Sequence, residues 1–324
     1  MHEHNLRGDM GASIASVAGS NRSVVRRLVC PRAALWAHGL LVCRRAHYRG
    51  RDMGDEMTAN LPLDTIIHGD CLEVLKTFPA GSVDIIWTDP PYGNNNNNGD
   101  LIARWEAALG RGSYAPGKDD RPILNDSYED FSVVVPGMLD EAARVMKKDF
   151  CCCCCCCGGG GPTPCFADVA KWIDERLAFC QAVVWDKGGL GMGWRYRRNY
   201  EFVMVSHRKG GKLKWETEWK DKRTANVVRI NKIIPRADQH PTPKPIELVE
   251  HFLRLHGKPG DIVLDPFCGG GTACVAAKRL GMHYIGIELD EHWVDYARRR
   301  LAEEDGVIHD KSGKEIATQE KLFA

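Results

Sequence analysis

The chain has 324 residues and a net charge of +1, from 44 lysine and arginine residues against 43 acids. This length suits one large α/β domain with an insertion or a small added lobe, and the near-neutral charge predicts no partner by itself. No run of 18 apolar residues occurs, so a membrane span is not expected. Seven of the 14 cysteines form one run and the others are scattered, which favours a reducing cytoplasm over a disulfide framework.

Residues 1–57 differ in composition from the rest of the chain, because arginines stand there among alanine, serine and glycine with few acids. Three interpretations stay open: a disordered or mis-started leader, a basic arm that contacts nucleic-acid phosphates, and an organelle transit peptide. We favour the leader, with Met53 or Met57 beginning the folded protein. Deletion of residues 1–56 is then expected to leave the activity intact.

The folded part is predicted to begin with the strand Asp64–His68, followed by Gly69, Asp70 and a helix. Asp70 stands where an N-cap is expected, since its carboxylate can accept a hydrogen bond from the first turn of that helix. A contact with a ligand at the strand end is compatible with capping.

A buried strand, Ile85–Thr88, runs into the corner Asp89-Pro90-Pro91-Tyr92. Both prolines have a fixed φ and lack an N–H, so the backbone is stiff and its carbonyls stay outside any helix. Asp89 contributes a carboxylate, Pro90 a free carbonyl and Tyr92 an aromatic face. These groups suit an amino-bearing heterocycle, because the acceptors take its N–H donors while its ring stacks on the tyrosine. The alternative is an ordinary turn that ends a strand.

The middle of the chain predicts structural elements with one unusual run. Asn94–Asn98 is a polar tract beside the corner, which suggests a flap that orders on binding. Helices are predicted over 128–146 and 166–177, and a strand over 180–185. The run Cys151–Cys157 precedes four glycines. Because any such run contains Cys-x-x-Cys, that match carries no information about zinc, and we predict a core strand and no metal.

From Lys187 to Arg236 the chain carries 14 lysine and arginine residues against four acids, a local charge of +10. Tryptophans and tyrosines are interleaved with these charges, before and after a strand predicted over 201–205. This composition fits a surface that neutralises phosphates and stacks bases. The alternative is a solvated basic hairpin with core aromatics.

A second buried strand, Ile262–Asp265, ends 176 residues after Asp89 and opens into the turn Pro266–Thr272, which holds Gly269, Gly270 and Gly271. A helix over 273–280 follows. Strand, glycine turn and helix form the unit that holds a cofactor in doubly wound α/β folds, with an acid about 20 residues beyond. Here a strand over 284–288 ends in Glu288. Neither the dinucleotide fingerprint nor a Gly-Lys-Ser/Thr sequence is present, so nucleotide hydrolysis is not expected.

Asp89-Pro-Pro-Tyr92 and Asp265-Pro-Phe-Cys-Gly-Gly-Gly-Thr272 together resemble the motifs of the S-adenosylmethionine-dependent DNA methyltransferases that modify amino groups. The family's usual turn has serine where this chain has Gly270. His240-Pro-Thr-Pro-Lys-Pro245 is similar to the family's His-Pro-Thr-x-Lys-Pro segment, which leads into a helix near the methionine end of the cofactor. The catalytic corner precedes the cofactor turn, an order that resembles the circularly permuted group often called beta.

The resemblance implies an α/β fold with a Rossmann-like, doubly wound methyltransferase sheet, circularly permuted, and a small basic target-recognition insertion. It implies site-specific methylation of double-stranded DNA after base flipping, with S-adenosyl-L-methionine as cofactor. Adenine is favoured over cytosine because an Asp-headed corner is more often found in the family's adenine enzymes. The catalytic residues implied are Asp89, Pro90, Pro91 and Tyr92. The cofactor-binding residues implied are Asp70, Thr242, Lys244, Asp265, Phe267, Gly269, Gly271, Thr272 and Glu288, and the DNA-binding residues are Arg195, Arg197 and Arg198.

We expect a catalytic domain over 58–303 and a tail over 304–324. The domain divides into a catalytic half (about 64–205), the basic segment (about 187–236) and a cofactor half (about 240–303). The alternatives are transfer to the cytosine amino group, an RNA or protein amide substrate, and a non-catalytic DNA-binding module. Methylation at carbon 5 of cytosine would need a thiolate, for which the lone pair Pro164-Cys165 is weak support. A bacterial or phage-encoded protein of the cytoplasm is expected, while a homodimer and a restriction partner stay open.

Overall fold

The computed structural model of the chain describes residues 61–93, 107, 110, 123–156, 166–189, 199–216, 224–233, 240–304, 307–309 and 315–318. The predictions for the leader 1–57, the run 94–98, the pair Pro164-Cys165 and the arginines 195, 197 and 198 lie outside these residues. No helix in the described part has the length and apolar composition needed to cross a membrane.

Helices and strands alternate along the described chain. In order they are β1 (Thr65–His68), α2 (Cys71–Lys76), β2 (Ile85–Thr88), α4 (Tyr128–Val145), β3 (Cys151–Cys156), α5 (Phe166–Arg176), β4 (Leu177–Asp186), β5 (Tyr200–Arg208), β6 (Val227–Arg229), α6 (Ile246–His256), β7 (Ile262–Asp265), α7 (Thr272–Arg279), β8 (His283–Glu288), α8 (Glu291–Glu303), β9 (Val307–His309) and β10 (Glu315–Thr318).

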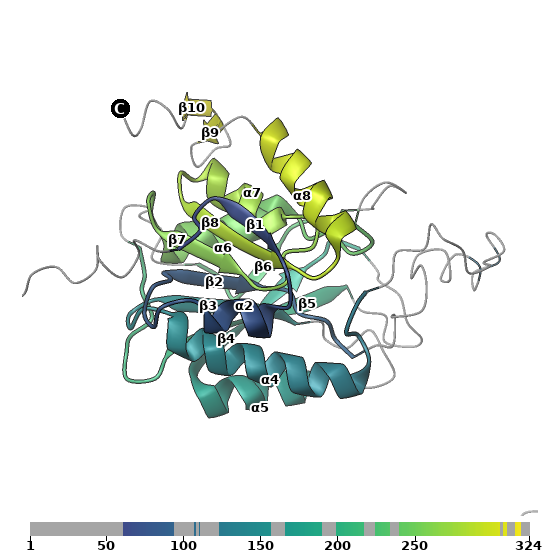
Figure 1. Cartoon of the computed structure of the whole chain (residues 1–324), viewed down its shortest axis with the longest axis vertical. Coiled ribbons are helices and arrows are strands. Elements are labelled where there is room, and N and C mark those ends of the chain that lie inside the picture. Colours follow the sequence, from purple (N-terminus) through teal and green to yellow (C-terminus); the bar gives the residue numbers. More distant parts are fainter. Residues whose placement is uncertain are drawn as a thin grey trace, which may run out of the picture. The chain divides into compact units, whose positions relative to one another are not determined.

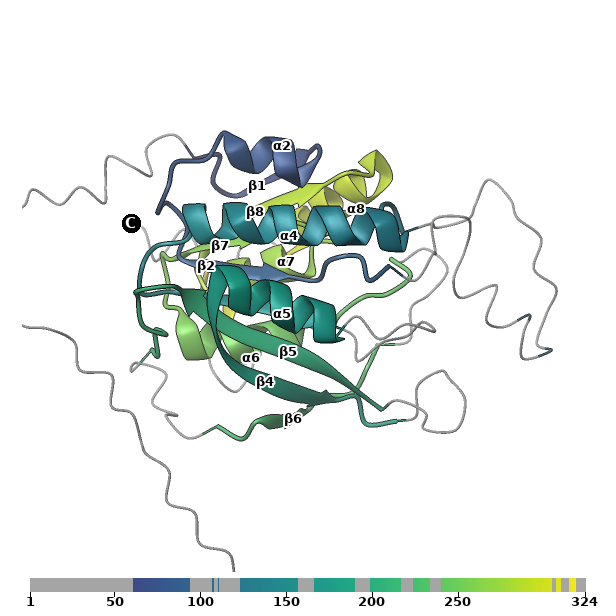
Figure 2. The same cartoon turned by 90° about the horizontal axis from the view of Figure 1, so that it is seen from below.

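An eight-stranded sheet organises these elements, in the order β1-β8-β7-β2-β3-β5-β4-β6. Strands β1, β8, β7, β2 and β3 run parallel, β5 runs antiparallel to its neighbours β3 and β4, and β6 runs parallel to β4. Helices α7 and α8 lie on one side of the sheet and α2, α4 and α5 on the other (Figure 1). Figure 2 shows α2, α4 and α5 in front of the strands. The predicted doubly wound α/β architecture is confirmed.

The centre of the sheet is strand β2, whose four residues are all buried. Trp87 packs on Phe252 of α6, with ring centroids 5.5 Å apart, whereas Ile86 belongs to the core formed with α2, α4 and α5. Burial on both faces explains why this strand is apolar throughout and not alternating. Strand β2 therefore holds the corner that follows it on a rigid support.

The chain winds in opposite directions from β2 and from β7. From β7 it passes through α7 to β8, and from β2 through α4 to β3, so the two connections leave a pair of adjacent strands toward opposite edges of the sheet. Parallel pairing sets Ile86 opposite Leu264, so both strands end at the same edge. In open α/β sheets ligands bind at the carboxyl ends of strands where the winding reverses.

The cysteine run is a core strand, as predicted. It forms β3 between β2 and β5, and the side chains of Cys151 and Cys152 are fully buried. The helices over 128–146 and 166–177 are confirmed to within a residue. Strand β4 begins earlier than predicted, at Leu177, because its antiparallel pairing with β5 continues to the pair Leu177–Arg208. No group of three potential metal ligands gathers among the described residues.

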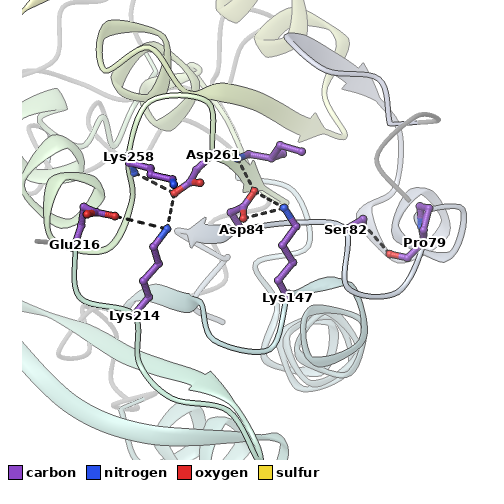
Figure 3. A network of polar contacts seen from close by, with 9 residues as sticks. Pro79, Ser82, Asp84, Lys147, Lys214, Glu216, Lys258 and Asp261 are labelled. Atoms are coloured by element: carbon purple, nitrogen blue, oxygen red, sulfur yellow. Dashed lines mark hydrogen bonds and ion pairs between the residues drawn. The ribbon is translucent and has the colours of Figure 1, made fainter. Parts of the chain in front are cut away.

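Partly buried ion pairs join the starts of the central strands (Figure 3). Asp84, just before β2, accepts hydrogen bonds from Lys147 Nζ at 2.9 Å and from the backbone N of Ile262 at 2.9 Å. Beside it, Asp261 accepts a bond from Lys214 Nζ at 2.9 Å. These contacts tie the beginnings of β2 and β7 to the segments before β3 and after β5, and they fix the amino edge of the sheet.

Candidate active site

The corner after β2 is held by its own side chains. The hydroxyl of Tyr92 donates to Asp89 Oδ1, and the backbone N of Tyr92 donates to Oδ1 of the buried Asp126 at 2.8 Å. Gly93 follows with φ +69°, and a Cβ there would lie 3.2 Å from α4. The two prolines, the aspartate bond and the glycine thus hold Asp89 in one place.

Lys244, which is distant in the sequence, pairs with Asp89 of this corner. Its Nζ lies 2.5 Å from Asp89 Oδ2 and 3.7 Å from Oε2 of Glu201 on β5. The other oxygen of Glu201 accepts a bond from Lys187 Nζ at 3.0 Å. Only 9% of the Lys244 side chain is exposed, so its charge is balanced mainly by neighbouring protein groups, these carboxylates among them, and not by water.

Sheet topology explains why these charges meet. Strand β5 is antiparallel to β3 and β4, so its first residues lie at the edge where the parallel strands end. Glu201 therefore stands at the same edge as Asp89, and Lys187 follows the end of β4. Lys244 comes two residues before α6, whose core face packs against Trp87 on β2.

The pKa values of Asp89 and Glu201 shift in opposite directions. Burial raises the pKa of Asp89 above its usual value, although Lys244 and Tyr92 act to lower it. Burial would also raise the pKa of Glu201, but the charges of Lys244 and Lys187 outweigh it and leave that pKa lowered. Glu201 is thus the more firmly ionised of the two acids.

The glycine turn after β7 is anchored by Glu288 at the end of β8. The backbone N of Gly269 donates to Glu288 Oε2 at 2.8 Å, and the N of Asp290 donates to Oε1 at 2.9 Å. Gly269 and Gly271 adopt φ of +47° and +76°, which glycine adopts most easily. Asp265 is buried at the end of β7 and accepts a bond from the N of Phe267 at 3.2 Å.

Carboxylates accumulate at this edge, which makes it a fitting receptor for a cation. Burial raises the pKa of Asp265 well above its usual value, and the nearby charges of Asp89 and Glu288 add to the rise. Burial also raises the pKa of Glu288. A ligand with positive charge and hydroxyl donors would stabilise the ionised form of these carboxyls. S-adenosylmethionine carries a sulfonium, an ammonium and a ribose. The acceptor set therefore fits that cofactor.

The glycine turn packs closely against His240. A Cβ at Gly269 would lie 3.1 Å from Nε2 of His240, and one at Gly270 would lie 3.4 Å from the Cβ of the same histidine. The ring of His240 packs edge-on against Trp293 of α8, with centroids 4.7 Å apart. The segment over 240–245 thus lies against the glycine turn, as the motif resemblance implies.

The remaining predicted cofactor residues have visible structural contacts. Thr272 Oγ1 accepts a bond from Arg300 at 3.1 Å, and the backbone N of Thr242 donates to His240 Nδ1 at 3.3 Å. Asp70 caps α2 by accepting from the N of Leu72 at 2.8 Å, which confirms the predicted N-cap. Lys244 contacts the catalytic corner directly. Their cofactor roles stay predictions.

Sequence reasoning missed Glu201, Lys187 and Asp126. Glu201 opens an apolar strand, and an acid in that place carries a signal only when the strand is known to be antiparallel. Asp126 lies in a loop-like stretch 34 residues from the tyrosine backbone that it binds. In each case the contact depends on pairing across the sheet or a loop, which periodicity does not reveal.

A doubly wound α/β sheet with buried carboxylates and a glycine turn at the ends of adjacent parallel strands is typical of enzymes that bind a cofactor at this edge. The family model for the N6/N4 methyltransferases, described as DNA methylase, matches residues 83–299. The chain therefore belongs to this DNA methylase family. Membership confirms the predicted DNA amino-methyltransferase and, with it, S-adenosyl-L-methionine as the methyl donor.

Two relatives and one solved structure illustrate the likeness. The Type II methyltransferase M.HinfI of Haemophilus influenzae is 29% identical over 266 residues, which are 74% of this chain and 69% of that protein. The DNA adenine methyltransferase YhdJ of Escherichia coli K12 is 26% identical over 287 residues, 79% of this chain and 87% of that protein. The PvuII DNA methyltransferase (cytosine-N4-specific) shares the fold, with a TM-score of 0.55, 18% identity, and coverage of 80% of this chain and 89% of its own.

Proposed function

We propose that this enzyme methylates the exocyclic amino group of adenine at specific sites in double-stranded DNA. The observation that supports this best is that Asp89 and Asp265 stand at the ends of the adjacent parallel strands β2 and β7, close enough for the charge of Asp89 to raise the pKa of Asp265. One carboxylate then receives the amino group while the other faces the cofactor turn. Residues 176 positions apart in the chain thus serve one reaction.

The residues of the corner act on a weak nucleophile. The amino nitrogen reacts poorly because its lone pair is delocalised into the base. The Asp89 carboxylate and the Pro90 carbonyl accept its N–H bonds and so favour a pyramidal nitrogen as positive charge develops. When bound, S-adenosylmethionine supplies the methyl group from a positively charged sulfur that becomes a neutral thioether. Tyr92 offers its ring to the flipped base, and no covalent bond to the protein is required.

The residues of the cofactor half bind the cofactor and do not themselves react. Asp265 and Glu288 balance positive charge and accept hydroxyl donors beside the turn Gly269–Gly271, a type of turn in which glycine lets a ligand approach the backbone. The contact between Glu288 and the N of Gly269 keeps the turn in shape. Asp70, after β1, stands next to the strand that ends in Glu288, because His68 pairs with Glu288.

Adenine is favoured over cytosine by two considerations. The Asp-headed corner resembles that of the family's adenine enzymes, and YhdJ, which aligns over 79% of this chain, is an adenine methyltransferase. The cytosine enzyme PvuII shares only 18% identity, so its likeness concerns the fold. Transfer to cytosine N4 is the second candidate.

DNA contact is assigned to the basic segment over 187–236 with Arg195, Arg197 and Arg198. Replacing these three arginines together should lower DNA affinity and flatten its dependence on salt, because fewer phosphate contacts release fewer counterions. Replacing the exposed Lys76 and Lys171, on α2 and α5, is the matched control and should leave both unchanged.

The function is tested by incubating the full chain with S-adenosylmethionine labelled on its methyl group and random-sequence duplex DNA, followed by digestion to nucleosides. Label in N6-methyldeoxyadenosine is the expected result. Label in N4-methyldeoxycytidine would move the assignment to cytosine, and label in 5-methyldeoxycytidine would contradict an amino acceptor. Parallel incubations with RNA and with protein serve as comparisons; label there and not in DNA would overturn the proposal.

A further inference from the structure

Four charged side chains alternate in sign at the carboxyl edge of the sheet. Lys187 follows β4, Glu201 belongs to β5, Lys244 precedes α6, and Asp89 follows β2. The nitrogen–oxygen distances along this row are 3.0, 3.7 and 2.5 Å. None of the four side chains is more than one-fifth exposed, so each charge is compensated mainly by its neighbours.

The middle distance in this row is too long for a hydrogen bond. Oε1 of Glu201 is held by Lys187, whereas Oε2 is buried and accepts no hydrogen bond from the part of the chain that the structure describes. That oxygen lies 3.7 Å from Lys244 Nζ. A shift of the ammonium by about 1 Å would bring it to ordinary hydrogen-bond distance from Glu201. Lys244 thus has a second acceptor within reach.

The amino group of the substrate and the ammonium of Lys244 compete for the Asp89 carboxylate. Oδ1 of Asp89 accepts from Tyr92 and Oδ2 from Lys244. An incoming amino group must share these oxygens. As its nitrogen forms the bond to the methyl carbon, it takes on positive charge until one of its protons leaves. A second cation so close to Asp89 would oppose that charge.

We propose that Glu201 is a positioning residue for methyl transfer, which receives the ammonium of Lys244 when the base arrives and so leaves the Asp89 carboxylate to the amino group. This inference rests on the proposed function and adds to it a residue outside the two motifs. Lys187 fixes Glu201 in place from the other side. The positive charge stays in the site but moves away from the reacting nitrogen.

The surrounding charges set the direction of the pH effect. Asp89 is faced by Lys244, by Tyr92 of its own corner, by Glu201 from β5 and by Asp265 from β7. Glu201 adds to the rise in the pKa of Asp89 that burial causes. Removing the negative charge of Glu201 should therefore lower the pKa of Asp89 and move the acidic limb of the kcat–pH profile to lower pH.

The test is Glu201→Gln in the full chain, measured as kcat, KM for duplex DNA, cofactor Kd and the pH profile of kcat. We expect kcat to fall about 10- to 100-fold, because an unshared ammonium then stays beside Asp89. Cofactor Kd should stay at the wild-type value while the acidic limb moves to lower pH. Glu216→Gln is the matched control, since Glu216 faces Lys214 at 3.8 Å on the opposite edge and is similarly buried. It should change neither kcat nor the limb.

A Glu201→Gln enzyme with wild-type kcat, or with lower kcat and an unmoved limb, would overturn the assignment. If this variant does not fold, as judged by thermal melting, Glu201→Asp carries the test. Its shorter side chain keeps the charge but withdraws it from Lys244, so kcat must fall while the limb stays near its wild-type pH; an undiminished kcat would contradict the proposal. Transfer by the wild-type enzyme tests the proposed function separately.

Discussion

Strand β2 carries an aspartate paired with a lysine at each of its ends, and the two pairs differ in their other partners. At the start, Asp84 binds Lys147 and the backbone N of Ile262, whose position is fixed by the sheet. At the finish, Asp89 binds only side chains among the contacts described above, and its lysine has a second carboxylate nearby. The same residue types thus form a fixed structural contact at one end of β2. At the other end they form an ion pair whose lysine has a second acceptor within reach.

The difference teaches that the partners of an ion pair, rather than the pair itself, indicate its role. A carboxylate that binds both a lysine and the backbone of the neighbouring strand, as Asp84 does, cannot be released without breaking the sheet edge. A carboxylate held by side chains can pass its hydrogen bonds to a ligand at small cost. We therefore assign Asp84 to stability and Asp89 to chemistry, although a sequence motif marks only the second.

The largest expected effect separates the two ends by activity. Asp89→Ala should reduce methyl transfer about 10³-fold or more, because the amino group loses its preorganised acceptor. Its cofactor Kd should stay close to wild type, and its melting temperature should fall less than that of Asp84→Ala, because Glu201 lies within reach of the ammonium of Lys244. Rates with labelled cofactor and calorimetric titration measure the two quantities. A parallel loss of cofactor binding would show that the corner is structural.

The reverse pattern is expected at the start of the strand. Asp84→Ala leaves Lys147 and the N of Ile262 without their carboxylate, so the free energy of unfolding should fall by about 2–4 kcal/mol. Urea unfolding followed by circular dichroism measures this change. The kcat of the remaining folded enzyme should be unchanged; a stable but inactive variant would erase the contrast between the two ends.

A glycine pair sharpens the comparison within the cofactor half. Gly271 and Gly260 both have positive φ, +76° and +85°, but a Cβ at Gly271 would lie 2.9 Å from the Cβ of Ala297 while none of the neighbouring atoms comes within 4 Å at Gly260. Gly260→Ala should cost about 1 kcal/mol of backbone strain, and Gly271→Ala about 1–3 kcal/mol with weaker cofactor binding. Equal effects in melting and titration would mean that α8 does not constrain the turn.

The smallest effect concerns pH. Burial raises the pKa of Asp265, so its carboxyl is protonated over a wider range than usual and ionises as pH rises. A cationic cofactor binds the ionised form better, so Kd should fall with rising pH, and binding should release protons. The raised pKa also means that ionisation lowers stability as pH rises. Asp265→Asn should give a Kd that depends less on pH, because only Glu288 then titrates beside the turn, and a relative gain in melting temperature toward neutral pH.

Local sequence patterns predicted most of the fold. The apolar runs of β2, β7 and β8 and the helical periodicity of α4 and α5 predict these elements directly. The cysteine run forms a strand, and its first two side chains are buried. The start of β4 was predicted three residues too late, because its pairing with β5 continues back to Leu177, a residue that the prediction placed in the preceding helix.

The sequence predicted only those site residues that belong to recognisable motifs. Asp89 and the glycine turn could be brought together because parallel strands that change winding direction share an edge. The assignment of Lys244 to the cofactor stays a prediction, and its ion pair with Asp89 at 2.5 Å was not foreseen, because it joins residues far apart in the sequence. Glu201 could not be found, because its place follows from the reversed direction of one strand.

The most direct test of the account is a crystal structure of the protein with S-adenosylmethionine bound. We predict the methyl carbon about 4–6 Å from the Asp89 carboxylate, which leaves room for an amino nitrogen at about 3 Å from each, and ribose hydroxyls on Glu288. A cofactor bound at the amino edge, near Asp84, or with its methyl group turned away from the corner would contradict it.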